Sequence, residues 1–436
     1  MSCAERAEWW RPEVVSRDLP PSRVEGEAER PEVAGSRASF RALMAFTFVL
    51  LVAPQAFVPA LAHLRPGLLT AAAALTAYLF DRLLYKQPVV LVTREIVAAG
   101  FLAVWALITV PMSYWAGGSL ALLLDEYLKT LAIFWLLSNV VNTSGRLLDV
   151  ARGLTLMAVP MAAVGVHQYL AGMFLDGRIQ SYDAPLASNP NDLALMLNLI
   201  LPLSLALALL ETRTLPRLIV LGCAAMSAVA VILTFSRAGF IALSLTALIY
   251  FVKLMRRPGR VWAIAVLCLA LACVPFMPSG YAQRLSTILN IQSDPTGSAQ
   301  ERWGDTMAAI HFISRNPIIG AGIGMNILAL NEERGAIWKK VHNVYLEYAM
   351  DLGLPGLFLF LLILFGCFRA VSFVMHRTKG STPLRRLFLL AEGIQVSLVA
   401  FTISGFFHPV AYNFYFYYVG GLALAARAAC AGEARE

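Results

Sequence analysis

Charged residues are scarce in this sequence. Only 14% of its 436 residues are charged and 58% are hydrophobic, whereas soluble globular proteins are about a quarter charged and about half apolar. This composition excludes an ordinary soluble enzyme and a disordered chain. Apolar runs of roughly twenty residues argue against a β-barrel, whose strands alternate between apolar and polar residues. We therefore expect an all-α, polytopic helical membrane protein.

Several motifs of soluble enzymes are also missing. The six cysteines form no Cys-x-x-Cys pair, so zinc and redox motifs are unsupported. The glycines of Gly320-Ala-Gly322-Ile-Gly324 lack the spacing of a nucleotide-binding loop, and we interpret them as a flexible turn. No Asp-x-Asp cluster of metal ligands stands out in the outer loop, and no cofactor is expected. In a membrane protein, a net charge of +8 points first to basic cytoplasmic loops and not to nucleic-acid binding.

Apolar segments long enough to cross a membrane follow a charged, proline-containing start. About twelve are predicted, at 43–62, 67–85, 95–113, 119–140, 150–171, 191–210, 216–234, 238–255, 260–278, 354–371, 385–407 and 410–428. The predicted organisation is a disordered cytoplasmic tail at 1–41, nine spans in 42–278, a large outer loop with amphipathic helices at 279–353, three spans in 354–428 and a short cytoplasmic tail at 429–436.

Lysine and arginine are distributed unevenly between alternate loops. One set of loops is rich in them, as in Arg377-Thr-Lys379 followed by Arg385 and Arg386. The opposite short loops carry only Arg65, Arg178 and Arg237. Because basic loops stay on the cytoplasmic side, we expect both termini inside and the loop 279–353 outside.

Two arginines at the outer face are candidates for anion binding. Arg237 is the only charge between two apolar runs. It either anchors at the membrane interface or binds phosphate oxygens with its guanidinium fork. Arg302 is predicted in the first turn of a helix that the capping box Ser298-Ala-Gln-Glu301 starts. A cation there is unfavourable to the helix dipole, so its partner is either a bound anion or the carboxylates Glu301 and Asp305.

Two histidines are candidates for a general base, because histidine titrates near neutral pH and can take a proton from a hydroxyl. His342 precedes a stripe of polar residues, Asn343, Glu347 and Asp351, on one helix face. His408, at the outer end of a predicted span, is the rival base. Either histidine could equally be an interfacial residue without a chemical role.

Two further groups of polar residues have alternative interpretations. Asn189 and Pro190 are typical of a helix start, while Asn191 and Asp192 could line an outer cavity. Asp125 and Lys129 can pair at i, i+4 within the fourth span, and charges there could also serve a transporter as a coupling site. The candidate chemistry lies at the outer face and no internal repeat is evident, so a transporter or flippase is the weaker alternative.

Four segments in order resemble the O-antigen ligase and polymerase superfamily of bacterial inner-membrane glycosyltransferases. They are Asn189-Pro-Asn-Asp192, Ser236-Arg237-Ala-Gly-Phe240, Arg302-Trp303 through Asn316-Pro317 to Gly322, and His342-Asn343-x-Tyr345-Leu-Glu347 with Gly353 to Gly356. The resemblance implies a GT-C-like fold in the inner membrane, with the active site facing the periplasm. It implies a glycan donor on undecaprenyl diphosphate and metal-independent, inverting transfer.

The resemblance also implies roles for single residues. Arg237 and Arg302 take the places of the diphosphate-binding arginines, and His342 that of the essential histidine. Possible donor or acceptor cavity residues are Asn191, Asp192, Asn343, Tyr345, Glu347 and Arg315. The acceptor stays open between lipid A–core for a ligase, a further repeat unit for a polymerase, and a protein hydroxyl. The single large outer loop favours the ligase. The oligomeric state is not predicted.

Overall fold

The computed structural model describes residues 37–86, 92–175, 178–179, 184, 186–187, 189–257, 264 and 297–433, and these residues are mainly helical. The elements are α1 (Arg37–Val52), α2 (Pro54–Phe57), η1 (Pro59–Leu64), α3 (Pro66–Leu84), α4 (Arg94–Thr109), η2 (Val110–Met112), α5 (Ala116–Leu122), the π-helical η3 (Leu123–Tyr127), α6 (Leu128–Val140), α7 (Ser144–Leu170), β1 (Phe174–Leu175), β2 (Arg178–Ile179), α8 (Pro190–Leu210), α9 (Thr214–Leu233), α10 (Arg237–Met255), α13 (Ser298–Arg315), α14 (Asn326–Arg334), α15 (Val344–Thr378), α16 (Arg385–Ser404) and α17 (Phe414–Glu433).

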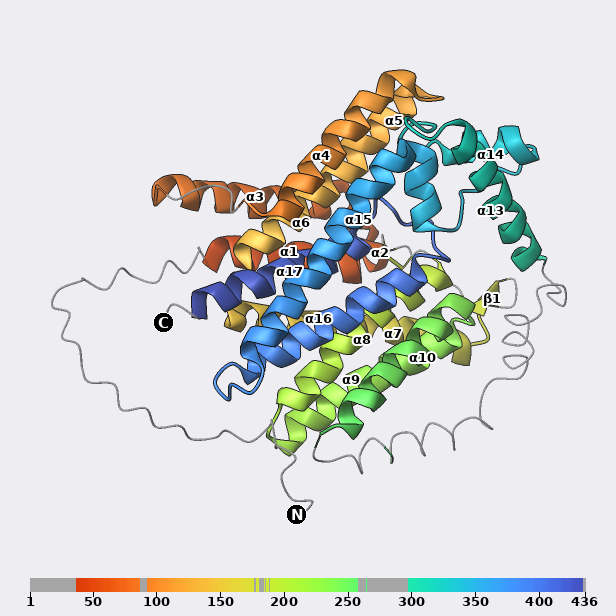
Figure 1. Cartoon of the computed structure of the whole chain (residues 1–436). Coiled ribbons are helices and arrows are strands. Elements are labelled where there is room, and N and C mark those ends of the chain that lie inside the picture. The colour runs from red at the N-terminus through yellow and green to blue at the C-terminus, as the bar shows by residue number, and fades with distance from the viewer. Residues whose placement is uncertain are drawn as a thin grey trace, which may run out of the picture.

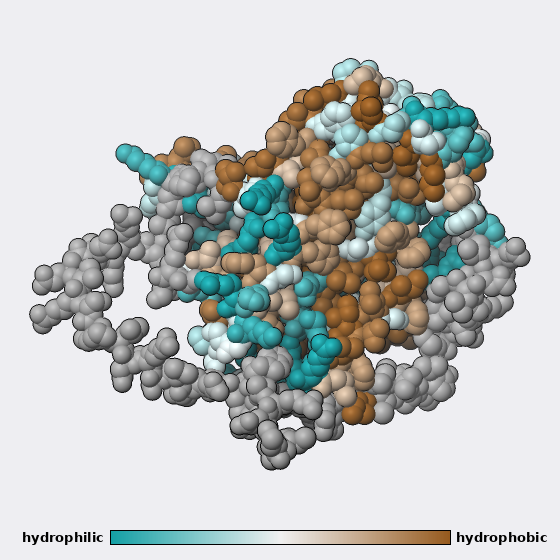
Figure 2. Space-filling view, viewed as in Figure 1, coloured by the Kyte–Doolittle hydropathy of each residue, from teal (hydrophilic) through white to brown (hydrophobic). Residues whose placement is uncertain are grey.

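The expected fold class, an all-α polytopic membrane protein, is confirmed. Within the described ranges, eight helices are long and apolar enough to cross a membrane. Apolar side chains also point outward at helical spacing on α4, where Val97, Phe101 and Val104 are each at least 42% exposed. Figure 2 shows hydrophobic residues over much of α4 and α10, and hydrophilic residues over α14. Such an outward apolar surface is suited to lipid.

The predicted first span, 43–62, is wrong as a single helix. α1 begins at Arg37, inside the predicted tail, and ends at Val52. Ala53 then adopts a left-handed conformation with φ of 47°, and separate short helices start at Pro54 and Pro59. The prolines account for the break, because proline starts helices well and interrupts them inside. The predicted span 260–278 lies outside the described residues, except for Ile264.

The predicted span 354–371 is part of a longer helix with a kink. α15 runs over 35 residues from Val344 to Thr378, and Gly353 inside it has φ of 66° and ψ of −176°. Only glycine adopts this conformation readily. The nine residues before the kink therefore form a separate short helix that leads into the long one.

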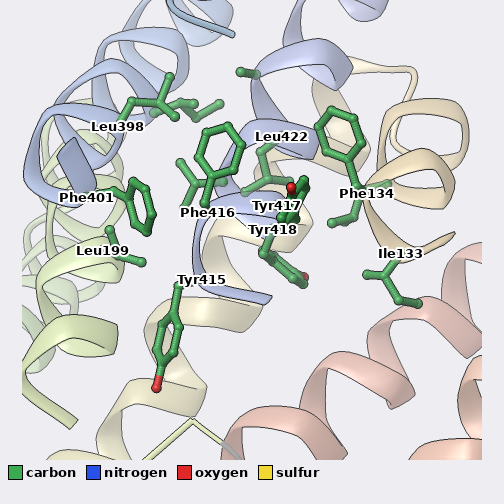
Figure 3. Close-up of a cluster of buried hydrophobic side chains, with 14 of the residues drawn as sticks. Ile133, Phe134, Leu199, Leu398, Phe401, Tyr415, Phe416, Tyr417, Tyr418 and Leu422 are labelled. Carbon is green, nitrogen blue, oxygen red and sulfur yellow. The ribbon is translucent and has the colours of Figure 1, made fainter. Parts of the chain in front are cut away.

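The buried interior is built around α8 and α17. α8 packs against α9 and α16, and nearly every residue from Leu193 to Leu203 is buried; Figure 1 shows these helices side by side. In Figure 3, Phe416 of α17 faces Phe401 of α16, while Tyr417 lies near Phe134 of α6. A helix that is apolar on all sides belongs inside the bundle, and α8 and α17 fill that place.

The glycine cluster 320–324 is a turn, as expected, but it is not flexible. Gly320, Gly322 and Gly324 all have positive φ, between 73° and 93°. A Cβ atom on Gly320 would lie 2.4 Å from the carbonyl oxygen of Met350. The backbone N–H of Gly324 donates to Asp351 Oδ2 at 2.9 Å. Close packing against the start of α15 therefore fixes this turn.

α13 begins within one residue of the helix start that the sequence predicts near Ala299. The helix begins at Ser298, with Gly297 in the N-cap position. Its apolar stripe Trp303, Met307 and Ile310 is exposed. The face that packs against the rest of the protein instead carries residues of different size and polarity. Asp305, Ala309 and Phe312 lie on it, and each is at most 2% exposed. α13 and α14 lie together at one end of the bundle (Figure 1).

Candidate functional site

Asn191, in the first turn of α8, is where several of the polar residues meet. Its Oδ1 atom accepts a hydrogen bond from Arg178 Nη2 at 2.7 Å and another from Ser236 Oγ at 2.9 Å. Its carbonyl oxygen lies 3.2 Å from His408 Nε2. One amide side chain and its own backbone thus join the starts of α8 and α10, the β1–β2 hairpin and the end of α16.

Local capping brings these helix starts into place. Asn189 caps α8 by accepting hydrogen bonds from the backbone N–H groups of Asn191 and Asp192 at 2.9 and 3.1 Å, as the sequence predicted. Ser236 caps α10 by accepting from Gly239 N at 3.1 Å. Ser and Asn are favoured caps because their side chains satisfy otherwise unpaired helix N–H groups. Arg237 is consequently the first residue of α10, half-buried and next to Ser236.

His342 lies directly before the N-cap residue of α15. Its position is held by the backbone N–H of Val344, which donates to Gly405 O at 2.7 Å. The Nδ1 atom of His342 is buried and makes no hydrogen bond within the described part of the chain. Burial lowers the pKa of His342 to about 4, and the positive charges of Arg302 and His408 act in the same direction, while the Lys340 backbone and the charge of Glu301 oppose this shift. The imidazole is therefore neutral near pH 7, with a lone pair able to accept a proton.

Both ring nitrogens of His408, the rival base, contact backbone carbonyl oxygens. His408 is 2% exposed, and its two ring nitrogens lie 2.9 Å from Ser404 O and 3.2 Å from Asn191 O. Burial lowers its pKa to about 4, although both carbonyl contacts favour the charged ring. A neutral ring donates to only one of the two carbonyls, and the tautomer with its proton on Nε2 donates to Asn191 O and so ties the end of α16 to α8. Taking a proton from an outside hydroxyl would disturb this contact, so the geometry favours His342.

Arg302 lies near both histidines. It is half-buried on α13, and its charge lowers the pKa of His342 and of His408. The two carboxylates that the sequence offered as its partners are ion-paired with other cations. Glu301 binds Lys339 Nζ at 2.7 and 2.9 Å, and buried Asp305 pairs with Arg334. These pairs hold α13 against α14 and the segment before His342.

Three of the predicted cavity residues serve the structure around His342. Asn343 is the N-cap of α15 and accepts from Tyr345 N and Leu346 N at 2.9 and 3.1 Å. The Tyr345 hydroxyl donates to Thr402 O at 2.8 Å. Glu347 is 1% exposed and accepts from the backbone N–H of Ala411 at 3.0 Å. These contacts fasten the start of α15 to the segment around His408.

The remaining predicted polar residues lie apart from His342 or at the edge of the site. Asp192 Oδ2 accepts from Asn189 Nδ2 at 2.5 Å, beside Asn191. The Arg315 side chain is 63% exposed and lies 3.6 Å from Glu333 Oε1, so it belongs to the solvated surface of α13 and α14. Asp125 and Lys129 form the expected i, i+4 pair at 3.7 Å, and both side chains are more than half exposed.

Sequence reasoning missed Arg178. It lies in β2, and besides Asn191 it contacts Thr234 O through Nε at 3.3 Å. Its charge also lowers the pKa of His408. The available signal was its place among the few basic residues of the loops that are predicted to face outward, shortly before the Asn-Pro-Asn segment. Arg178, Arg302 and the neutral His342 together make the region suited to an anion beside a proton acceptor.

A comparison with known families finds a match for part of the chain. The family model described as O-Antigen ligase matches residues 221–361, a segment that contains Arg237, Arg302 and His342. The curated proteins contain no match to the chain. The expected resemblance to the O-antigen ligase superfamily is confirmed over this segment. It indicates a glycosyltransferase-like membrane enzyme of ligase or polymerase type.

Proposed function

Given that residues 221–361 are of the O-antigen ligase type, we propose that the protein transfers a glycan from undecaprenyl diphosphate to an acceptor hydroxyl. The acceptor proposed is lipid A–core, in the periplasmic leaflet of a bacterial inner membrane. The observation that carries the proposal is His342: a half-buried imidazole whose Nδ1 atom is buried without a hydrogen bond in the described structure, and whose pKa is lowered to about 4, with Arg302 nearby.

In the proposed reaction, the acceptor oxygen attacks the anomeric carbon of the donor sugar and forms the new glycosidic bond. The bond from that carbon to the diphosphate oxygen breaks, and the configuration inverts. His342 accepts the proton of the acceptor hydroxyl. Negative charge develops on the departing lipid diphosphate. Arg237 and Arg302 stabilise it, since guanidinium groups match phosphate oxygens and no metal is required.

The overall orientation supports the same proposal. The unequal loop charges predict that the starts of α8 and α10 and the segment before α15 face the periplasm, with both termini in the cytoplasm. The lipid donor would then reach the site sideways from the bilayer, past outward-facing apolar side chains such as those of α4.

A reconstituted transfer assay tests the function. Purified protein in vesicles is given an undecaprenyl-diphosphate glycan, with or without lipid A–core, and with or without EDTA. Glycan on lipid A–core, unaffected by EDTA, is the expected result. Longer chains on the lipid carrier without lipid A–core would identify a polymerase instead. Absence of any product, together with passage of the lipid-linked glycan across the vesicle membrane, would refute transfer and identify a transporter.

A further inference from the structure

A cationic pocket lies at the end of the bundle away from His342. Its volume is about 320 Å³, within the range of about 300–1,000 Å³ for small-molecule sites. It is formed where α8, α10 and α15 end and where α16 begins. The proposed transfer site lies at the other ends of the same four helices. α8 has 21 residues, so the two sites are about 30 Å apart along it, close to the thickness of a bilayer's apolar core.

One side of the pocket is positively charged. Arg257 Nη2 lies 2.6 Å from Glu392 Oε2, and Lys253 Nζ lies 3.4 Å from the same oxygen. Glu392 is only 3% exposed, so one buried carboxylate is shared by two cations. Arg385 adds a further positive charge and donates from Nη2 to Leu209 O at 2.9 Å. Of these residues, Arg257 and Arg385 line the pocket, and the four side chains together carry a net positive charge, which favours an anionic ligand.

The start of α16 adds hydrogen-bond donors to this side. Leu384 occupies the N-cap position, and no side chain caps the helix. An uncapped helix start presents backbone N–H groups and the positive end of the helix dipole, which suits a phosphate. Ser381 and Thr382, just before it, line the same pocket and can donate hydroxyl hydrogen bonds to phosphate oxygens.

The other side of the pocket is apolar. Leu254 and Phe388 line it together with Leu209 and Leu389. A free phosphate ion gains nothing from such a wall, whereas a phospholipid presents its charged headgroup to the arginines and its glycerol and first acyl carbons to the leucines. Basic pockets between membrane helices on the cytoplasmic side recognise anionic lipids in this way.

From these observations we infer that the pocket binds the phosphate headgroup of an anionic diacyl phospholipid in the cytoplasmic leaflet. The lipid bridges the loop between α15 and α16 to the ends of α8 and α10. It therefore fastens the four helices that carry the transfer site at their opposite ends. The inference does not depend on the proposed transfer reaction.

Thermal unfolding of the delipidated full-length protein in mild detergent tests the inference. The melting temperature is followed during titration with phosphatidylglycerol, with phosphatidylcholine and with inorganic phosphate. Phosphatidylglycerol is expected to raise it, because a ligand of the folded state stabilises that state. Phosphatidylcholine and inorganic phosphate should leave it nearly unchanged. An equal effect of phosphatidylcholine would overturn the inference, and an equal effect of inorganic phosphate would assign the pocket to free phosphate.

Two neighbouring arginines provide a matched pair of variants. Arg385→Ala removes a charge that lines the pocket, and Arg386→Ala removes an equal charge from the adjacent exposed position. Loss of a charged hydrogen bond should weaken phosphatidylglycerol binding by about tenfold in the first variant only. An equal loss in both variants would reduce the effect to general surface charge and refute the pocket.

A second pair covers the case in which Arg385→Ala disturbs folding, since Arg385 also bonds Leu209. Ser381→Glu places a negative charge at the half-buried lining position 381, and Ser381→Gln adds nearly the same volume without the charge. Binding of phosphatidylglycerol should be lost in Ser381→Glu and retained in Ser381→Gln. Retention in both variants would contradict the inference.

Discussion

At the scale of single residues, Asn191 and His342 have opposite roles. Asn191 uses its side chain and its carbonyl to hold Arg178, Ser236 and His408 in place. His342 keeps Nδ1 without a hydrogen bond, although a buried polar atom without a partner costs about 1–3 kcal/mol. Such a cost is expected where a substrate supplies the missing partner. The site thus combines positioned cations with one proton acceptor.

Replacing His342 tests the base. His342→Ala should lower kcat by roughly 100-fold or more, the usual contribution of a general base, while insertion and protein level stay normal. Arg302 and Arg237 would still bind the donor, so KM should change less. The measurement is transfer in vesicles with matched amounts of protein. Wild-type turnover in this variant would remove His342 from the reaction.

The pH dependence of the wild-type protein tests the same residue. A base must be neutral, and the pKa of His342 in the free protein is about 4. kcat/KM should therefore stay level as the pH falls through 6.5 and decline only well below it, since this parameter reports the free enzyme. In the complex with substrate, the negative diphosphate favours the charged imidazole and so raises the pKa of His342. The acid limb of kcat should therefore lie at higher pH than that of kcat/KM. If the acid limbs of kcat and kcat/KM coincided near pH 6.5, the assignment of His342 as the base would be contradicted.

Arg302 is expected to need its guanidinium and not only its charge. Arg302→Lys keeps the charge but loses the planar fork that matches two phosphate oxygens, and kcat/KM should fall by at least about tenfold. Arg217→Lys is the control, because Arg217 is an exposed residue at the opposite end of the bundle, in the first turn of α9. Equal activity of both variants would reduce Arg302 to a structural role.

At the scale of elements, the kink in α15 decides where His342 lies. Gly353 has a conformation that other residues rarely adopt, and its backbone packs against Pro317 and Ile318. The N–H of the next residue, Leu354, donates to Pro317 O at 2.7 Å. The short helix before the kink, with Asn343 at its start, is thereby turned toward α13 and α14. The membrane helix and the site are joined at this point.

Gly353→Ala should be strongly destabilising. A Cβ atom there would lie 2.0 Å from Ile318 O, and the backbone strain alone costs about 1–3 kcal/mol. The control is Gly222→Ala in the middle of α9, where a Cβ atom meets nothing within 4 Å and the helix gains propensity. Thermal unfolding in detergent should show a lower midpoint for Gly353→Ala only. Equal midpoints would mean that the kink can relax.

At the scale of the whole molecule, a buried ion pair joins distant helices. Arg427 of α17 donates to both oxygens of Glu95 at the start of α4, at 3.1 and 2.7 Å. Glu95 is only 6% exposed, so its charge depends on this partner. The pair lies at the far end of α17 from the loop that carries His408. It therefore contributes to assembly of the bundle rather than to the site.

Breaking this ion pair should cost stability and not catalysis. Arg427→Met leaves Glu95 buried without its partner, a loss of roughly 2–3 kcal/mol, below the range for fully buried pairs because the Arg427 side chain is 30% exposed. The double variant Glu95→Gln with Arg427→Met should recover much of this loss. Chemical unfolding of the wild type, the single variant and the double variant measures the loss and its recovery. A double variant no more stable than the single one would show that the pair itself stabilises the fold.

The charged start of the chain should be dispensable for transfer. Deletion of residues 1–35 leaves α1, which begins at Arg37, intact. These residues combine arginine, glutamate and proline in a pattern typical of a solvated tail. Specific activity in vesicles should equal that of the full chain. An inserted but inactive truncation would refute the predicted dispensability of the tail.

The sequence by itself determined the membrane class, the helix start at Asn189 and the family resemblance. Apolar length, capping chemistry and short motifs are local properties, so they can be read from neighbouring residues. The tertiary structure alone decided that Asn191 meets Arg178, Ser236 and His408, which are 13, 45 and 217 residues away in the chain. It also turned the expected flexible glycine loop into a fixed one, because packing against Asp351 and Met350 depends on contacts that no local pattern records.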